Sequence, residues 1–166
     1  TSAQAPGPAT AATERTALGA AQVVQSALRN GDRAGIVVLG GWRPRWLGAD
    51  IGRRQFYRVL DAVLGVGSGF ETTTGTLAPP AAVPPGAIVV GFSTLLDTEF
   101  ALALIDLRKR GHVVVAVDVL EGAPFEDEQD PLVARMWALQ RSAMYRDMGA
   151  IGVDVVSWWG ESTLDQ

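Results

Sequence analysis

The sequence predicts an α/β domain of three layers, in which helices cover both faces of a doubly wound, mostly parallel sheet. Strand-length apolar runs alternate along the chain with segments whose apolar residues recur every three or four positions, the spacing of amphipathic helices. The runs are also nearly continuous in apolar character, as is typical of strands covered on both faces. They comprise residues 34–40, 86–93, 112–119 and 152–159.

The run at residues 86–93 is expected to be the central strand. Most of its side chains are β-branched or aromatic, which favours a buried strand, namely Ile88, Val89, Val90 and Phe92. Between residues 95 and 107 the apolar positions change to helical spacing. We therefore predict a strand in the middle of the sheet, followed directly by a helix.

Three further helices are expected. Apolar spacing predicts one over residues 13–30, where Asn-Gly provides a left-handed stop. A second helix is expected to open at Asp50. A third begins at Asp130, because an aspartate suited to capping is followed by Pro131 at the first helical position.

The remaining segments predict one domain with an irregular surface. Residues 42–47 surround a proline, which cannot donate to a β-ladder, so we expect them to form an antiparallel strand at the sheet edge. Residues 65–86 are expected to form a long loop. The domain is predicted to span residues 13–160, with a disordered or loop segment at 1–12 and a tail at 161–166.

Composition excludes several classes of function. The chain has 166 residues, of which 48% are hydrophobic, enough for one domain with a buried core. Its net charge of −4 argues against a nucleic acid partner. The absence of cysteine excludes disulfides, thiolate catalysis and cysteine-ligated metals. No apolar run reaches the roughly 18 residues of a membrane span.

Catalytic residues are poorly represented. Ligands of open α/β sheets bind beyond the carboxyl ends of the strands, so Ser93, Thr94 and Asp97 mark the place where chemistry would occur. Asp118 also ends a strand, but it lacks an evident catalytic partner. His112, the only histidine, is predicted to be a surface residue rather than a base. Neither a Gly-x-Ser-x-Gly elbow nor a Gly-x-Gly-x-x-Gly turn opening a helix is present.

A basic and aromatic segment is the candidate partner-binding surface. Arginine and tryptophan are the residues most enriched at the centres of protein interfaces, so we expect an acidic protein partner here. The alternative is a solvated helix side beside an edge strand. The candidate residues are Trp42, Arg43, Arg45, Trp46, Arg53, Arg54 and Arg58.

Five segments, in this order, resemble a bacterial family, the von Willebrand factor A-like domain-of-unknown-function family fifty-eight. Together they extend over nearly the whole chain, although no single one is diagnostic. They are NGDRAGIVVLGG at 30–41, GRRQFYRVLDA at 52–62, PPGAIVVGFS at 84–93, LRKRGHVVVAVD at 107–118 and GAIGVDVVSW at 149–158.

The resemblance implies a von Willebrand factor A-like fold and a non-catalytic role in binding a protein partner. Members are typically encoded beside MoxR-type AAA+ ATPases, so it implies work with such an ATPase in protein assembly or activation. It places the domain in the cytoplasm, at the inner face of the cell membrane, with membrane segments that are absent from this chain. It also implies that a first strand, ending in aspartate and lying in the middle of the sheet, is missing.

The resemblance further implies a degenerate metal site. Related domains hold Mg²⁺ through an Asp-x-Ser-x-Ser loop, a threonine and an aspartate after the central strand. The vestigial positions here are Ser2, Ser93 and Thr94, and Thr94 stands where the aspartate would supply an anionic oxygen. We therefore expect no metal or cofactor. The alternative is a divalent-metal-dependent binding domain, or an enzyme that uses the crevice at the strand ends.

Overall fold

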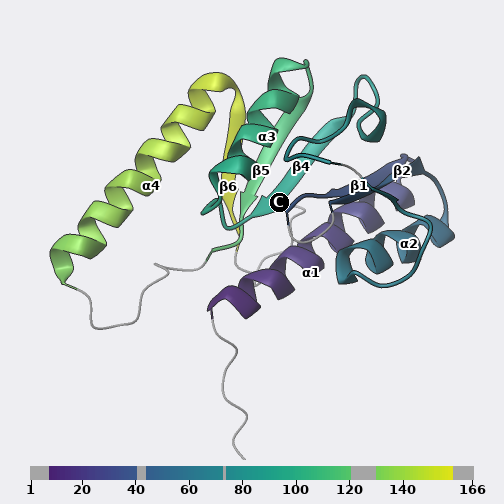
Figure 1. The fold of residues 1–166 in the computed structure, drawn as a ribbon, viewed down its shortest axis with the longest axis horizontal. Coiled ribbons are helices and arrows are strands. Elements are labelled where there is room, and N and C mark those ends of the chain that lie inside the picture. Colours follow the sequence, from purple (N-terminus) through teal and green to yellow (C-terminus); the bar gives the residue numbers. More distant parts are fainter. Residues whose placement is uncertain (1–7, 41–43, 73, 121–129, 159–166) are drawn as a thin grey trace, which may run out of the picture.

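The computed structural model describes residues 8–40, 44–72, 74–120 and 130–158 (Figure 1). Helices and strands are mixed along the described chain, which confirms the predicted α/β class. The strands form two three-stranded sheets, one parallel and one antiparallel, where we expected a single mostly parallel sheet.

The parallel sheet consists of β4 (Ile88–Ser93), β5 (Val113–Asp118) and β6 (Val153–Ser157), in that order. Among the described residues, 86–93 therefore contribute an edge strand of this sheet and not the predicted central strand. The middle strand is β5, which is buried over most of its length. In the sequence, β4 and β5 are both continuous apolar runs. Only the strands that pair with them show that β5 lies in the middle of the sheet and β4 at its edge.

Helices cover both faces of the parallel sheet. On one face, α3 (Thr98–Lys109) and α4 (Pro131–Ile151) join the strands in a core cluster. Its buried members include Leu104, Leu107, Val114, Ala116, Met148 and Val153. On the other face, α1 (Pro8–Arg29) supplies Ala12 to a smaller cluster. The remaining buried members of that cluster are Val117, Val119 and Trp158.

Close approach of α1 to the parallel sheet requires a glycine. A Cβ at position 19 would lie 2.5 Å from a ring carbon of Phe92 and 2.7 Å from one of Trp158. One turn earlier, Nε of Arg15 donates a 2.8 Å hydrogen bond to the carbonyl oxygen of Val119, just beyond β5. The amino-terminal part of α1 is thus held at the carboxyl end of the parallel strands.

The antiparallel sheet contains β1 (Ala34–Val38), β2 (Arg45–Asp50) and β3 (Glu71–Thr72). The pairing of β1 with β2 confirms an antiparallel strand here, but the prediction that it lies at a sheet edge is wrong, because β2 pairs with β3 on its other side. Helix α2 (Arg53–Leu64) packs with α1 over one face. Their shared core cluster is built on the buried Val24, Leu47 and Val59.

A buried amide ties α2 to an irregularity in this sheet. The register between β1 and β2 shifts after Ala34. Gln55 of α2, only 2% exposed, donates hydrogen bonds from Nε2 to the carbonyl oxygens of Ala34, at 2.7 Å, and Gly48, at 3.0 Å. These bonds satisfy two carbonyl groups near the register shift.

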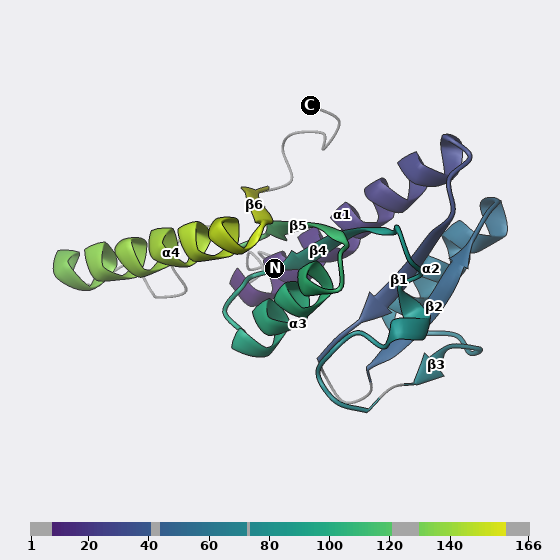
Figure 2. The same ribbon diagram turned by 90° about the horizontal axis from the view of Figure 1, so that it is seen from above.

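The two sheets lie side by side with β1 next to β4 (Figures 1 and 2). No Cα atom of β1 comes within 8 Å of a Cα atom of β4, so these edges do not pair. Helix α1 contacts both strands on one face, and the 3₁₀ turn η1 (Pro80–Ala82) contacts β1 and β2. The described residues contain no strand before α1, so the expected first strand is not among them.

The observed ends of the helices agree in part with those predicted from the sequence. Asp97 and Asp130 cap α3 and α4 by accepting hydrogen bonds, both 2.9 Å long, from the second residue of each helix. In contrast, α2 is capped by Gly52 rather than by Asp50. Helix α1 begins at Pro8, inside the predicted amino-terminal loop. None of the described helices combines the length and apolar character that crossing a membrane requires.

Candidate functional site

Polar side chains gather where the three parallel strands end. Ser93, Asp118 and Ser157 are the last residues of β4, β5 and β6, and strand register aligns them in one row. Carboxyl ends of parallel strands open on the same edge, where α/β sheets hold their ligands. Tertiary structure thus brings Ser93 close to Asp118, two candidates that the sequence presents separately.

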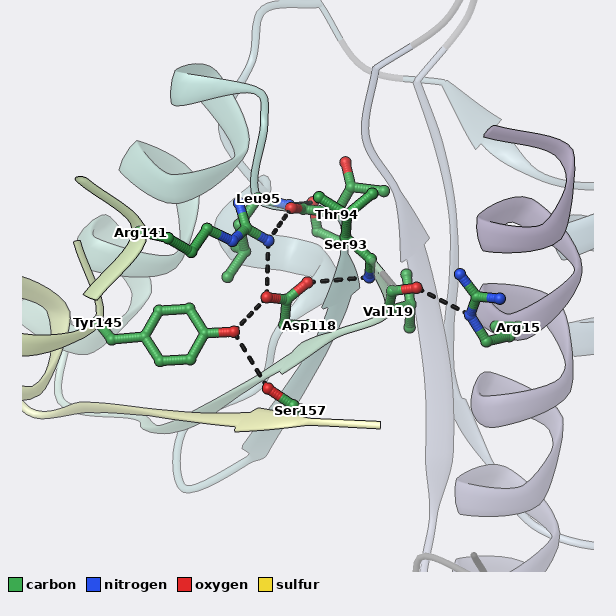
Figure 3. Close-up of polar contacts among 10 residues, drawn as sticks. Arg15, Ser93, Thr94, Leu95, Asp118, Val119, Arg141, Tyr145 and Ser157 are labelled. Carbon is green, nitrogen blue, oxygen red and sulfur yellow. Dashed lines mark hydrogen bonds and ion pairs between the residues drawn. The ribbon is translucent and has the colours of Figure 1, made fainter. Parts of the chain in front are cut away.

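Asp118 is the centre of this cluster (Figure 3). It is only 3% exposed. Its Oδ1 accepts a 2.9 Å hydrogen bond from the backbone N–H of Leu120. Its Oδ2 accepts one from Arg141, at 2.6 Å, and another from the hydroxyl of Tyr145. Burial of a carboxylate is unfavourable unless the group is paired and hydrogen-bonded, and these three donors meet that requirement.

Arg141 connects the cluster to the loop after β4. Besides pairing with Asp118, its guanidinium donates a hydrogen bond to the carbonyl oxygen of Thr94. Its central carbon lies 5.6 Å from the ring centre of Trp137 and 6.0 Å from that of Tyr145, distances compatible with cation–π attraction. One side chain of α4 is therefore joined to both β4 and β5.

The loop between β4 and α3 has an unusual backbone. Leu95 adopts a φ of +54°, a region that residues with side chains rarely occupy. Its side chain is buried, and its N–H donates a 2.9 Å hydrogen bond to Oγ of Ser93. Together with the Asp97 cap, these contacts hold the Thr94 carbonyl oxygen toward Arg141. Strain of this kind is concentrated at functional sites.

Tyr145 completes the cluster between β5 and β6. Its hydroxyl donates its one proton to Asp118 and lies 3.2 Å from Oγ of Ser157, so Ser157 is the donor in that second hydrogen bond. Burial, reinforced by the hydrogen bond to Asp118, raises the pKa of Tyr145 above its ordinary value near 10. The phenol is therefore protonated at neutral pH and is not poised to act as a base.

We expect alkaline loss of stability to depend on Tyr145. Since its pKa is higher in the folded state, its contribution to the free energy of unfolding is fully present below the ordinary pKa. That contribution is lost as pH rises through the folded-state pKa. Melting temperatures measured from about pH 8 to about pH 12 should fall more steeply for the wild type than for Tyr145→Phe. Parallel curves for the two proteins would contradict this expectation.

These residues do not fit a divalent cation. A hard cation needs several oxygen ligands with anionic character, but the Asp118 carboxylate and the Thr94 carbonyl oxygen already accept hydrogen bonds from Arg141. A cation here would have to displace a guanidinium group. Within the described segments, no three histidine, aspartate or glutamate side chains are grouped to bind metal. Ser2, the other vestigial position, lies outside the described residues.

Neither a family model, nor a curated protein, nor a solved structure matches this chain.

The predicted partner-binding residues have different surroundings. Trp42 and Arg43 lie outside the described residues. Arg45 is half-buried, and its guanidinium donates two hydrogen bonds, of 2.9 and 2.6 Å, to the carbonyl oxygen of Ala62 near the end of α2. Trp46 and Arg58 are half-buried, whereas Arg53 and Arg54 are exposed on the first turn of α2.

Sequence reasoning missed the partners of Asp118. Arg141 and Tyr145 are four residues apart in a predicted helix, so they share one helix face, but no local pattern indicates which strand end that face meets. The prediction for His112 was wrong in one respect. The residue is buried, at 6% exposure, and its Nδ1 lies 3.1 Å from the carbonyl oxygen of Ala87. The ring thus joins the start of β5 to the segment before β4.

Proposed function

We propose that this chain is a non-catalytic protein-interaction domain. The observation that supports this best is the closed network around Asp118. A catalytic carboxylate must be free to meet a substrate or to exchange a proton with it. Asp118 instead accepts hydrogen bonds from Leu120, Arg141 and Tyr145. The alternative, a metal-dependent binder or an enzyme at the same edge, would require Arg141 to leave this carboxylate.

We also propose a doubly wound, von Willebrand factor A-like fold and membership of the family fifty-eight named above. Support comes from the helices on both faces of the parallel sheet and from the adjacent edges of β1 and β4, to which no strand of the described residues is paired. One strand inserted between them would separate the two edges by about 10 Å, twice the usual strand spacing, which is compatible with the separation of more than 8 Å. Such a strand would belong to a segment outside the described residues.

The proposed partner is a MoxR-type AAA+ ATPase, met at the inner face of the cell membrane during protein assembly or activation. Among the described candidates, the exposed Arg53 and Arg54 are best placed to contact it. Tyr57, 58% exposed on the same helix, adds an aromatic ring beside them. Arginine and aromatic side chains together suit an acidic protein face.

Charge reversal at these two residues tests the proposal. We expect Arg53→Glu combined with Arg54→Glu to weaken binding of the purified cognate ATPase at least about tenfold, because attraction would become repulsion. Stability should not fall, since acidic residues are favourable in the first turn of a helix. Affinity can be measured by surface plasmon resonance.

Arg29→Glu provides the control, because Arg29 is also an exposed helical arginine but lies at the end of α1. Its binding should match that of the wild type. Equal ATPase affinity for all three proteins would reject the α2 surface.

A further inference from the structure

Helix α4 carries an apolar row on the face turned away from the parallel sheet. Leu132, Met136 and Leu139 are 62%, 53% and 62% exposed. Their spacing of four and then three residues places them on one helix face, and Ala143 continues the row after four more. We call these four residues the α4 stripe. Side chains on the opposite side of the helix, including Met144, Tyr145 and Met148, pack into the core cluster.

The amino-terminal half of α4 extends beyond the body of the protein (Figures 1 and 2). Among the described elements, only α3 and β6 have Cα atoms within 8 Å of α4. The hydrogen bonds from α4 to Asp118 and Thr94 come from Arg141 and Tyr145, in its carboxy-terminal half. All side chains at 131–140 are exposed except that of Trp137, which is half-buried. Leaving a row of large aliphatic side chains in water is unfavourable, and such rows mark interaction sites on folded proteins.

Charges beside the α4 stripe indicate what covers it. Arg135 and Arg146 are exposed and lie along one flank. The other flank carries Gln140 and Asp147. Arg141 is paired with Asp118, so the exposed charges of α4 are Arg135, Arg146 and Asp147, a positive sum in a chain whose net charge is −4. This basic, apolar helix in an acidic protein is complementary to an apolar surface with acidic groups beside it.

We propose that the α4 stripe docks an amphipathic helix of a partner protein that is acidic along the flank facing Arg135 and Arg146. Apolar residues at alternating three- and four-residue spacing are the pattern by which one helix packs along another. The proposal rests on the proposed function only in taking the ligand to be a protein, and its surface is separate from that of α2.

Two other occupants fit less well. An antiparallel pair of α4 helices from two copies would be isologous, so the arginine flank of one copy would face the same flank of the other. Like charges placed together in this way oppose association. A helix lying on a lipid surface presents basic residues over its polar face. In α4 the side opposite the stripe instead carries core residues such as Met144 and Met148.

A pair of synthetic helical peptides tests the docking site. Both have leucine at the seam positions; one has glutamate and the other lysine at the flanking positions. Fluorescence anisotropy with the full chain should show that the glutamate peptide binds at least about tenfold more tightly. Leu139→Gln should reduce that affinity about tenfold or more. Arg135→Glu combined with Arg146→Glu should reverse the preference in favour of the lysine peptide.

Leu102→Gln is the matched control, because Leu102 is a similarly exposed leucine, at 53%, on α3. This variant should bind the glutamate peptide as the wild type does, and circular dichroism should show that both leucine variants remain folded. Failure of both peptides to bind, or equal binding of the two, overturns the proposal. So does a dimer in sedimentation that Leu139→Gln dissociates, or binding to phosphatidylglycerol vesicles that the same variant abolishes. None of these outcomes affects the test of the α2 surface with the ATPase.

Discussion

Replacing Asp118 with alanine is expected to lower the free energy of unfolding by about 3–5 kcal/mol, because it leaves the Arg141 guanidinium without its carboxylate. The guanidinium side chain is 15% exposed and the Asp118 side chain 4%, so water does little to compensate. The variant also removes the acceptor of the Leu120 N–H and of the Tyr145 hydroxyl. Urea denaturation followed by circular dichroism measures the loss.

Asp106→Ala is the control for this experiment. Asp106 of α3 pairs with Arg110, the residue that follows the helix, and the two side chains are 35% and 26% exposed. Exposed pairs of this kind contribute about 1 kcal/mol or less.

The double variant Asp118→Ala with Arg141→Met should lose less free energy of unfolding than the sum of the losses of the two single variants. The reason is that Arg141→Met removes the charge that Asp118→Ala leaves unpaired. Additive losses, or equal losses at positions 106 and 118, would show that burial of the pair is unimportant.

Gly19→Ala is expected to destabilise the protein, although glycine to alanine usually stabilises a helix interior by about 1 kcal/mol. The new methyl group would lie 2.5 Å from Phe92 and 2.7 Å from Trp158, both aromatic, and Trp158 is buried. Overpacking of this kind costs about 1–3 kcal/mol. We therefore expect a net loss of about 1–2 kcal/mol in urea denaturation.

Gly149→Ala makes the same chemical change in α4, where a Cβ would meet no atom within 4 Å. It should stabilise the protein by up to about 1 kcal/mol. Opposite signs for the two variants would establish that contact with the sheet, rather than helix propensity, requires glycine at position 19. Stabilisation by Gly19→Ala would mean that α1 lies further from the parallel sheet.

Local pattern predicted most of the elements and several of their ends. Continuous apolar runs gave β1, β4, β5 and β6, because a strand covered on both faces needs apolar side chains throughout. Asp130 was recognisable as a cap, since capping involves only the next two or three residues. The start of α1 at Pro8 was missed, because Pro, Ala and Thr there lack an apolar period.

The candidate site could be predicted only in part. Ser93 and Asp118 were identifiable because each ends an apolar strand. Arg141 was not, because its partner lies 23 residues earlier in the chain and its role depends on how α4 packs against the sheet. Arg45 shows the converse. The sequence predicted Arg45 to be a residue that contacts a partner protein, yet its guanidinium donates hydrogen bonds to the carbonyl oxygen of Ala62 in α2.

The amino-acid sequence alone determined which segments become strands and helices, because periodicity and capping act between neighbours along the chain. Tertiary structure decided that β5 rather than β4 is the middle strand, and that the strands divide into two sheets among the described residues. It also decided that Asp118 is neutralised by Arg141. These outcomes depend on which edges pair and which helix faces meet them, and residues distant in sequence specify those contacts jointly.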